Sequence, residues 1–253
     1  MMDGVRVIVL AGGLGTRMGG ELPKVLTPLN NKPIIGYLVA ELAKLHLPHS
    51  PTIIVGAKAE MVREYLGPEY HYVQQPQQLG TGHAVGCARE ELLGTADTIV
   101  TLYGDHPLVT AKMVKRLVEK HCEEQPAMTL GVVKVPDFQD WRKALINFGR
   151  VVRNADGSVG RIVEFKDATE AEKNITEVNP SYFCFSSEWL WENITKLSNY
   201  NAQQEYYLTD LLKAAFDQGE KVATIQIEPQ EALGINTPEE LAKVAEFMEQ
   251  KQV

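Results

Sequence analysis

Residues 10–24, LAGGLGTRMGGELPK, combine a run of glycines with two positively charged side chains. The first glycines of this run are Gly12, Gly13 and Gly15. Glycine adopts positive φ angles without a steric penalty and lets the backbone approach a ligand, so that successive N–H groups can bind anionic oxygens. Arg17 and Lys24 add positive charge, and the ring of Pro23 stiffens the segment that carries the lysine. The stretch therefore predicts a loop that binds phosphate.

Two familiar phosphate-binding patterns do not fit this loop. The Walker pattern needs Lys and then Ser or Thr directly after its second glycine, and the Rossmann pattern needs a third glycine where this chain has Met18. The spacing therefore indicates a different kind of phosphate loop. A glycine-rich loop taken alone is also compatible with a solvated turn that carries surface charges.

Asp105 is the second candidate for chemistry, because it directly follows the stretch TIVTLYG. Such a run predicts a buried strand, and a carboxylate at the carboxyl end of a strand can reach a metal that is bound to a ligand. Magnesium usually takes one or two oxygens from the protein and the remainder from phosphate and water. We therefore expect Asp105 to hold Mg²⁺. The simpler alternative is an aspartate that forms the turn before Pro107.

The composition excludes several classes of partner. The chain has 253 residues, of which 44% are apolar, and a net charge of -8. A surface that follows the phosphates of nucleic acid or an anionic membrane needs an excess of Lys and Arg, so any phosphate must be bound at a local site. No apolar run reaches membrane-spanning length, and the three cysteines form no CxxC pair. We expect a cytoplasmic protein with no nucleic-acid or membrane partner.

Predicted strands and helices alternate along the first half of the chain, and these elements must position the candidate residues. Apolar runs there are separated by segments of helical periodicity, which predicts βαβ units and a parallel sheet with ligands at the carboxyl ends of its strands. In the second half, Asp156 and Gly157 stand between two β-rich runs and predict a hairpin, hence antiparallel strands. Helices are expected over 186–197, over 205–219 and from about Pro238.

The glycine-rich string resembles the signature of the sugar-nucleotide pyrophosphorylases, nucleotidyltransferases that join a nucleoside triphosphate to a sugar 1-phosphate. Seven further blocks follow in order: QQLGTGHA, YGDHPL, FGR, VEFKDAT, EVN, NAQQEYYLTD and GIN. Their order and spacing are similar to those of the uridyltransferase domains of N-acetylglucosamine-1-phosphate uridyltransferases. Each block alone is a weak signal, whereas seven in order make a chance match improbable.

The resemblance implies the nucleotide-diphospho-sugar transferase fold. This is a Rossmann-like α/β fold, with a mixed, mainly parallel sheet flanked by helices and an inserted antiparallel sugar-binding part. It implies a single nucleotidyltransferase domain over 1–253. We expect a nucleotide-binding half over about 1–110, a sugar-binding half over about 111–236, and a C-terminal helix over about 237–253.

The resemblance also implies a Mg²⁺-dependent reaction in which N-acetylglucosamine 1-phosphate attacks the α-phosphorus of UTP and releases pyrophosphate. The implied catalytic residues are Arg17, Lys24 and Asp105, and Asn236 joins Asp105 as a metal ligand. The implied nucleotide-binding residues are Leu10, Ala11, Gly12, Gly13, Gly15, Thr16, Gln75, Gly80 and Thr81. The implied sugar-binding residues are Tyr103, Gly104, Gly149, Glu164, Asn179, Tyr207 and Thr209.

One departure from the family concerns the sugar. Relatives usually have Asn-Thr-Gly where this chain has Asn179, Pro180 and Ser181. Because proline removes an N–H and fixes φ, backbone contacts to the sugar differ there, and glucose 1-phosphate or another sugar 1-phosphate is an alternative substrate. A regulatory protein that binds sugar nucleotides without turnover is a second alternative. A dehydrogenase is a weaker one, because Ala57 and Lys58 follow the strand TIIVG in place of an acidic residue.

The remaining candidates predict structure more than chemistry. His83 and His106 lie within the matching blocks, and we expect His106 to be a loop residue rather than a ligand. Trp141, Trp189 and Trp191 are expected to fill the core or an interface. The chain has no hexapeptide repeats, so acetyltransferase activity is not expected.

Overall fold

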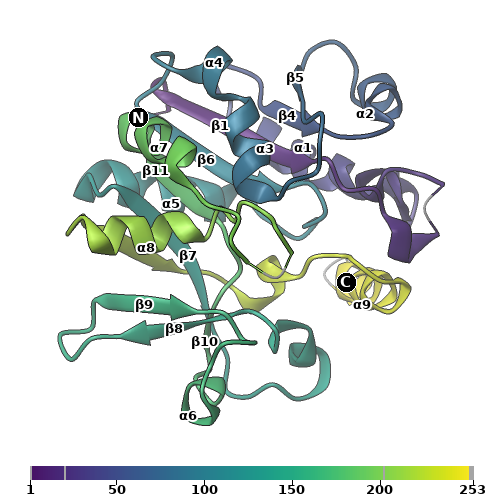
Figure 1. Cartoon of the computed structure of the whole chain (residues 1–253). Helices are drawn as coiled ribbons and strands as arrows, with labels where there is room; N and C mark the ends of the chain where they lie inside the picture. The colour runs from purple at the N-terminus through teal and green to yellow at the C-terminus, as the bar shows by residue number, and fades with distance from the viewer. Residues whose placement is uncertain (1, 20, 202, 251–253) are drawn as a thin grey trace.

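A mixed β-sheet runs through the molecule, and helices cover both of its faces (Figure 1). The computed structural model describes residues 2–19, 21–201 and 203–250. Within them the strand order is β5-β4-β1-β6-β11-β7-β10-β8-β9, with β12 paired to β7, and a separate small sheet joins β2 and β3.

The strands are β1 (Val5–Ala11), β2 (Pro28–Leu29), β3 (Lys32–Pro33), β4 (Thr52–Val55), β5 (His71–Gln74), β6 (Thr98–Tyr103), β7 (Met128–Lys134), β8 (Gly149–Arg153), β9 (Val159–Val163), β10 (Glu177–Asn179), β11 (Phe183–Ser186) and β12 (Val222–Gln226). The α-helices are α1 (Ile34–Ala43), α2 (Ala59–Leu66), α3 (Thr81–Cys87), α4 (Arg89–Leu92), α5 (Ala111–Glu124), α6 (Glu170–Lys173), α7 (Ser187–Asn193), α8 (Asp210–Asp217) and α9 (Pro238–Gln250). Among the described residues, no helix combines the length and the apolar character that crossing a membrane requires.

Strands β5, β4, β1 and β6 are parallel, as the sequence predicted. Ala11 pairs with Val55 in this register, Leu10 pairs with Tyr103, and Val55 also pairs with Gln74. The four strands therefore end at the same edge of the sheet. The glycine loop, the loop after β5 and the loop after β6 all begin there, which is the edge where open α/β sheets bind ligands.

Strands β1, β4 and β6 are buried because both faces of the sheet are covered, whereas β5 at the edge of the sheet is largely exposed. Successive side chains of a strand point to opposite faces, so the odd residues of β1, such as Val7 and Val9, pack in the cluster that includes α1 and α5. Ile8 packs in the other cluster, with residues of α3, α7 and α8. This double coverage explains the continuous apolar runs of these strands, which lack the polar alternation of a half-exposed sheet.

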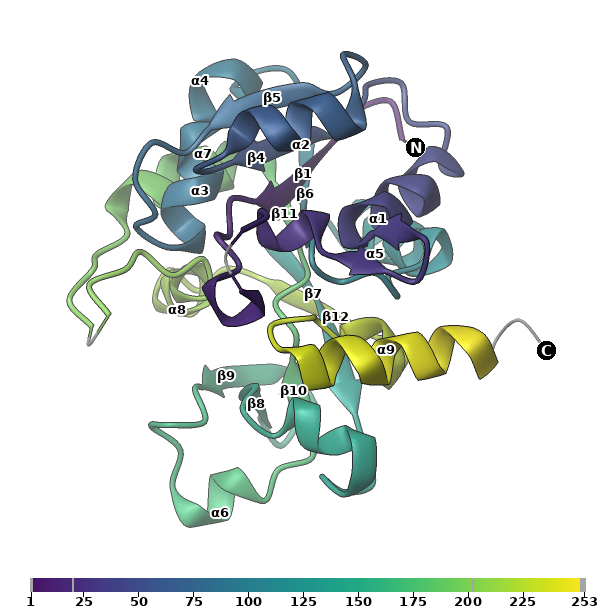
Figure 2. The ribbon, with the colours of Figure 1, turned by 90° about the vertical axis from the view of Figure 1, so that its right-hand side faces the viewer.

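The second half of the chain adds the antiparallel part. β11 pairs antiparallel with β6 and β7, and β10 pairs antiparallel with β7 and β8. The expected hairpin is confirmed, since β8 and β9 pair antiparallel and Gly157 in their turn has a φ of 85°. Figure 2 shows α9 running between the parallel part of the sheet and the region of β8, β9 and β10.

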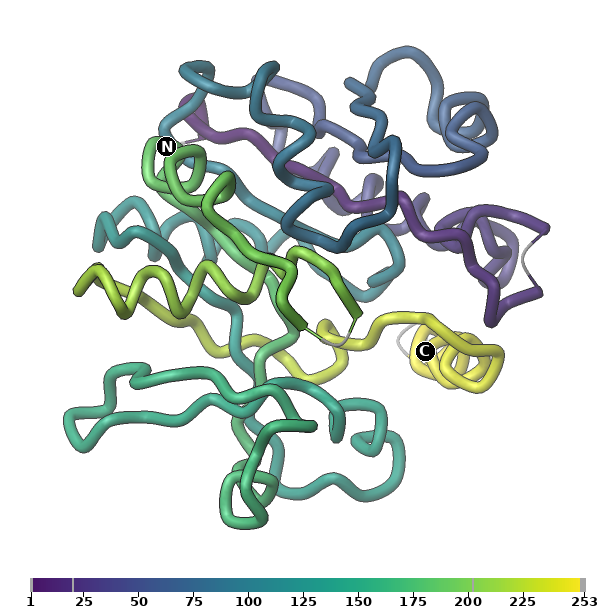
Figure 3. The backbone as a smooth tube through the Cα atoms, in the orientation of Figure 1, coloured from purple at the N-terminus to yellow at the C-terminus, as the bar shows by residue number. Residues whose placement is uncertain are grey.

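One helix prediction is wrong in its extent. The segment 205–219 was expected to be helical throughout, but α8 begins only at Asp210. The preceding residues are held instead by the loop before α3: the N–H of Tyr206 donates to Leu79 at 2.7 Å, and its carbonyl accepts from Gly82 at 2.8 Å. These tertiary backbone bonds outweigh the local helix preference. Figure 3 shows this connection between α7 and α8 passing next to the end of α3.

Candidate active site

A pocket of about 230 Å³ opens at the carboxyl edge of the parallel strands. The glycine loop, the loop between β5 and α3, and the end of β6 form its walls. Many of the predicted site residues line it, namely Leu10, Gly12, Gly13, Lys24, Gln75, Gly80, Thr81, Tyr103 and Asp105. Val25, Gln78, Ala84 and Glu205 complete the lining. The structure thus brings together residues that lie up to about 195 positions apart in the sequence.

The glycine loop is packed against the segment that carries Lys24. Gly15 has a left-handed φ of 68°, and a Cβ at this position would lie 3.0 Å from the Cα of Lys24. The backbone N–H of Lys24 donates to the carbonyl oxygen of Gly13 at 3.1 Å. Both the backbone angle and the close approach require glycine at position 15, and together they fix where the lysine side chain starts.

Ala11, Gly15, Thr16 and Arg17 do not line the pocket. The side chain of Ala11 is only 2% exposed and belongs to the core. Arg17 lies on the short 3-10 helix Thr16–Met18, where it is exposed. Within the described part of the chain its guanidinium has no hydrogen-bond or ion-pair partner. The loop therefore presents Arg17 to solvent near the pocket, with its charge uncommitted.

Lys24, Asp105 and Asn236 form a charged centre, of which Lys24 and Asp105 line the pocket and Asn236 does not. The ammonium of Lys24 donates to Oδ2 of Asp105, and to Oδ1 of Asn236 at 2.7 Å. The loop of Asn236 is fixed beside Asp105, because the N–H of Ile235 donates to the Asp105 carbonyl at 3.0 Å. The carboxylate of Glu240 accepts from the N–H of Asn236 at 2.6 Å. Backbone bonds thus bring two distant loops to one cation.

The charged centre supplies side-chain oxygens, which are the ligands that a hard divalent cation prefers. Two side-chain oxygens already converge on one positive charge, and Oδ1 of Asp105 is buried without a hydrogen-bond partner in the described residues. No group of three or more His, Cys, Asp or Glu side chains in those residues is arranged around a metal. Asp105 and Asn236 therefore suit an ion that takes few protein ligands and completes its shell with phosphate and water, as Mg²⁺ does.

The environment of Asp105 keeps it ionised. Burial raises the pKa of its carboxyl, but the neighbouring His106 and Lys24 outweigh that effect and hold the pKa below its ordinary value. His106 lies in the loop after β6, as expected, and burial lowers its pKa. The hydroxyl of Tyr182 donates to the Glu231 carbonyl, so it must accept from Nδ1 of His106. The ring of His106 is therefore fixed in orientation, a role that sequence reasoning missed.

Gln75 lines the pocket beside the glycine loop. Its side chain is buried, with the residue only 6% exposed. The amide nitrogen donates to the Gly80 carbonyl and to Nδ1 of His83, each at 3.1 Å. A Cβ on Gly12 would lie 3.0 Å from the amide oxygen, so this oxygen faces the glycine loop. The partnership with His83 was not predicted, because nothing in the sequence marks His83 beyond its place in a matching block.

Three of the predicted sugar-binding residues, Gly149, Glu164 and Asn179, lie near one another in the antiparallel part of the sheet. Asn179 of β10 pairs with Gly149 of β8, and a Cβ on Gly149 would lie 3.6 Å from a carboxylate oxygen of Glu164. Partial burial and then the Asp210 carboxylate raise the pKa of Glu164. The Glu164 charge in turn contributes to the raised pKa of Tyr207, after burial and Glu205.

Three further predicted residues lie at element ends. Burial raises the pKa of the Tyr103 hydroxyl, and the negative charge of Asp105 raises it further. Gly104 donates its N–H to the Leu10 carbonyl at 2.9 Å. Thr209 directly precedes α8.

The segment that departs from the family pattern has a defined geometry. The N–H of Ser181 donates to Oδ1 of Asn179 at 2.9 Å, which closes a turn around Pro180. Ser181 has a φ of 66°, a left-handed conformation that favours glycine. Oδ1 of Asn179 thus accepts one hydrogen bond and keeps one lone pair, and among the described residues the two N–H donors of its amide have no partner.

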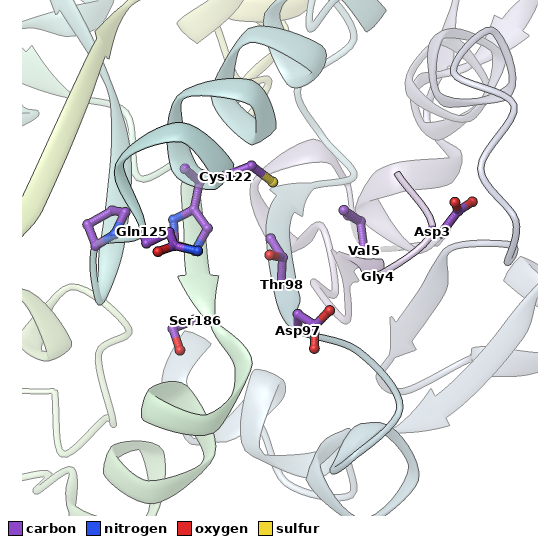
Figure 4. A pocket seen from close by; sticks show the side chains of 10 residues that line it. Asp3, Gly4, Val5, Asp97, Thr98, Cys122, Gln125 and Ser186 are labelled. Atoms are coloured by element: carbon purple, nitrogen blue, oxygen red, sulfur yellow. The ribbon is translucent and has the colours of Figure 1, made fainter. Parts of the chain in front are cut away.

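A second pocket, of about 480 Å³, lies at the opposite edge of the sheet. Figure 4 shows that it is lined from the start of β1, the start of β6, the end of α5 and the end of β11. It contains none of the predicted site residues. The hydrophobic core lies between the two edges. Trp189 and Trp191 are 8% and 1% exposed and pack in this core, as expected.

Comparison with known proteins agrees with the geometry of the first pocket. Residues 7–203 match the family of MobA-like NTP transferase domains. The chain is 39% identical over 251 residues to the bifunctional protein GlmU of Brevibacillus brevis. The alignment covers 99% of this chain and 53% of that protein. It is 38% identical over 251 residues to GlmU of Bacillus subtilis, again covering 53% of that protein. The chain therefore spans about half the length of these curated relatives.

Solved structures confirm the predicted fold. Apo UDP-glucose pyrophosphorylase superposes with a TM-score of 0.75 at 15% identity, covering 98% of this chain and all of that one. A UDP-glucose pyrophosphorylase complexed with UDP-glucose gives a TM-score of 0.73 at 16% identity, covering 97% and 98%. The mixed, mainly parallel sheet flanked by helices is thus the nucleotide-diphospho-sugar transferase fold that the sequence implied.

Proposed function

The chain belongs to the family of MobA-like NTP transferase domains, and we propose that it makes UDP-N-acetylglucosamine and pyrophosphate from UTP and N-acetylglucosamine 1-phosphate. At the coarser level it is a nucleotidyltransferase of sugar-nucleotide metabolism. The observation that carries the proposal is the convergence of Lys24, Asp105 and Asn236 beside the glycine loop. The choice of these substrates rests on the sequence blocks that resemble the N-acetylglucosamine-1-phosphate uridyltransferases.

In the proposed reaction a phosphate oxygen of the sugar phosphate attacks the α-phosphorus of UTP. A new bond forms between that oxygen and the α-phosphorus, the bond to the bridging oxygen breaks, and pyrophosphate leaves. The enzyme then has only to align the two phosphates and neutralise their charge. Lys24 supplies one fixed positive charge next to the glycine loop, and Arg17 supplies a second from its exposed position. Asp105 and Asn236 would hold Mg²⁺, which when bound neutralises charge on the triphosphate.

The proposed recognition of the two substrates divides along the sheet. The oxygen of Gln75 and the backbone around Gly12 would meet the edge of the base. Glu164 would accept from sugar hydroxyls, and the amide N–H groups of Asn179 would donate to a hydroxyl or to the acetamido carbonyl. We also propose the corresponding division of the chain, with nucleotide contacts from about 1–110 and sugar contacts mainly from about 111–236.

A pyrophosphate-release assay over four nucleoside triphosphates and several sugar 1-phosphates tests the proposal. We expect the fastest release with UTP and N-acetylglucosamine 1-phosphate, and none after chelation of divalent cations. A pocket built for the acetamido group leaves a buried polar group unpaired when glucose 1-phosphate binds, at a cost of about 1–3 kcal/mol. The preference for N-acetylglucosamine 1-phosphate over glucose 1-phosphate should therefore reach at least about tenfold in kcat/KM.

Two results would change the conclusion. Equal or better use of glucose 1-phosphate would assign the chain to another sugar, and the turn of Asn179, Pro180 and Ser181 gives a physical reason to include that substrate. Binding of a sugar nucleotide without pyrophosphate release from any pair would indicate a regulatory binding protein in place of an enzyme.

A further inference from the structure

The side-chain amide of Gln75 is held in one orientation by two neighbours. Its nitrogen lies 3.1 Å from the carbonyl oxygen of Gly80 and 3.1 Å from Nδ1 of His83. A carbonyl oxygen can only accept a hydrogen bond, so the atom that faces Gly80 must be the amide nitrogen. A rotation of the amide by 180° would place two acceptors against each other there. The positions of both amide atoms are therefore determined.

The same contacts determine the state of His83. An amide nitrogen can only donate, so Nδ1 of His83 must accept, and the ring is neutral with its proton on Nε2. Nε2 points to the sulfur of Cys87, 3.9 Å away on the next turn of α3. Both hydrogens of the Gln75 amide are thereby used, one by Gly80 and one by His83. The loss of either acceptor would leave a buried N–H unpaired, since Gln75 is only 6% exposed.

The remaining atom of the amide is an acceptor that faces the pocket. The oxygen of Gln75 lies where a side chain on Gly12 would begin, 3.0 Å from the position of a Cβ, and it has no hydrogen-bond partner among the described residues. A uracil ring presents an N–H at position 3, between two carbonyl groups, whereas cytosine has an unprotonated ring nitrogen there. The fixed oxygen matches the first ring and opposes the second.

We propose that His83 is a positioning residue for base selection, which holds the Gln75 amide with its oxygen toward the nucleotide and so favours uracil over cytosine. The proposal rests on the proposed function to the extent that Gln75 meets the base. His83 itself does not line the pocket, and it acts through Gln75 alone. Without His83 the freed N–H turns to regain a partner, and the oxygen loses its fixed direction.

Variants of His83 test this role through the ratio of UTP to CTP. His83→Ala removes the acceptor, and His83→Leu removes it while filling more of the space of the ring. His83→Asn keeps an acceptor, because its side-chain oxygen lies about as far from the backbone as Nδ1. Cys87→Ala is the matched control, since it alters the contact to the other ring nitrogen and leaves Nδ1 in place. Circular dichroism and thermal melting establish which variants are folded.

Calorimetric binding of UTP and CTP with Mg²⁺ is the first measurement, because it does not require turnover. The wild type should bind UTP at least about tenfold more tightly than CTP, which is one decade for one well-placed hydrogen bond. His83→Ala and His83→Leu should lower that ratio by about tenfold, while His83→Asn and Cys87→Ala should keep it within about threefold. In pyrophosphate release the two damaging variants should raise KM for UTP and leave kcat nearly unchanged, because the base contact is the same before and during reaction.

The outcomes separate the inference from the proposed function. An unchanged UTP-to-CTP ratio in folded His83→Ala and His83→Leu would overturn the role of His83, even if the chain is an active uridylyltransferase. Loss of the ratio in Cys87→Ala or His83→Asn to the same degree would also overturn it, because the effect would then not depend on the acceptor at Nδ1. Selective binding without pyrophosphate release would remove the proposed reaction and leave the role of His83 standing. Equal binding of UTP and CTP by the wild type would exclude it.

Discussion

Replacement of Asp105 by Asn changes the charge of the centre and little else. The variant side chain has nearly the same shape and still offers an oxygen to Lys24, whose ammonium also keeps its 2.7 Å bond to Asn236. The change removes the one carboxylate of the three side chains that form the charged centre. If Asp105 and Asn236 hold Mg²⁺ against the triphosphate, a neutral ligand pair must hold the ion less well.

The expected magnitude follows from the environment of Asp105. The residue is only 9% exposed, so little solvent screens its charge. Removal of one preorganised electrostatic group from a catalytic site costs about a hundredfold or more in rate, which corresponds to about 2.7 kcal/mol in the activation barrier. The loss of stability should stay on the order of 1–3 kcal/mol, because Asn236 continues to accept from Lys24.

The assay compares pyrophosphate release by wild type, Asp105→Asn and Asp97→Asn over a range of Mg²⁺ concentrations. Asp97 is a matched control, since it precedes the same strand at its other end and lines the pocket of Figure 4. Asp97→Asn should keep the wild-type rate. Asp105→Asn should need more Mg²⁺ and remain at least about a hundredfold slower at saturation. A folded Asp105→Asn variant with nearly wild-type rates at saturating Mg²⁺ would refute the metal role.

Stability against pH gives a second check on Asp105. Its folded-state pKa lies below the ordinary 3.8, so its ionised form stabilises the folded chain above that pH. The difference in unfolding free energy between wild type and Asp105→Asn should be constant from neutral pH down to about 5 and should shrink as the pH falls through the lowered pKa. A difference that vanishes already near neutral pH would contradict the ion pair with Lys24.

Three further substitutions test other parts of the site. Arg17→Ala should lower kcat more than it raises KM for UTP if the guanidinium meets charge that develops during reaction, and a change in KM alone would limit Arg17 to binding. Gly15→Ala should lower both stability and rate, because its φ of 68° and the 3.0 Å approach to Lys24 exclude a side chain; unaltered melting and kinetics would contradict this. In the wild type, KM for the sugar phosphate should rise as the pH falls through the raised pKa of Glu164, and Glu164→Gln should abolish that dependence; a persisting dependence would point to another group.

The parallel half of the fold could be predicted because its signal is local. A strand buried on both faces must be largely apolar, and β1, β4 and β6 are apolar except for Arg6, Thr52, Thr98 and Thr101. Once these strands are parallel, their carboxyl ends share one edge, and the residues that follow them must meet. Gly12, Gln75 and Asp105 line the same pocket for this reason.

The position of Asn236 could not be derived in the same way. It lies 131 residues after Asp105, and the contact depends on the hydrogen bond from Ile235 to the Asp105 carbonyl and on the carboxylate of Glu240. Only the resemblance of the block GIN to a known family pointed to it. A single backbone bond between distant loops leaves no pattern in composition or periodicity.

The start of α8 could not be predicted from the local sequence either. The segment from Glu205 has a helical pattern, yet its backbone bonds to the loop before α3, where Gly80 has a φ of 102° and a Cβ on it would lie 2.6 Å from the Tyr206 carbonyl. The glycines that permit this approach are about 125 residues away from the segment they hold. Helical periodicity reports what a segment can do alone, and it does not report which backbone groups another loop will satisfy.

Pro180 and Ser181, which depart from the family pattern, affect the hydrogen bonds that Asn179 can make with a ligand. The turn leaves Ser181 in a left-handed conformation, which costs about 1–2 kcal/mol for a residue with a Cβ, and the bond from its N–H to Asn179 offsets part of that cost. The same bond uses one lone pair of the Asn179 oxygen. The amide then has two N–H donors and one remaining lone pair, so a ligand acceptor such as an acetamido carbonyl suits it better than the hydrogen of a hydroxyl.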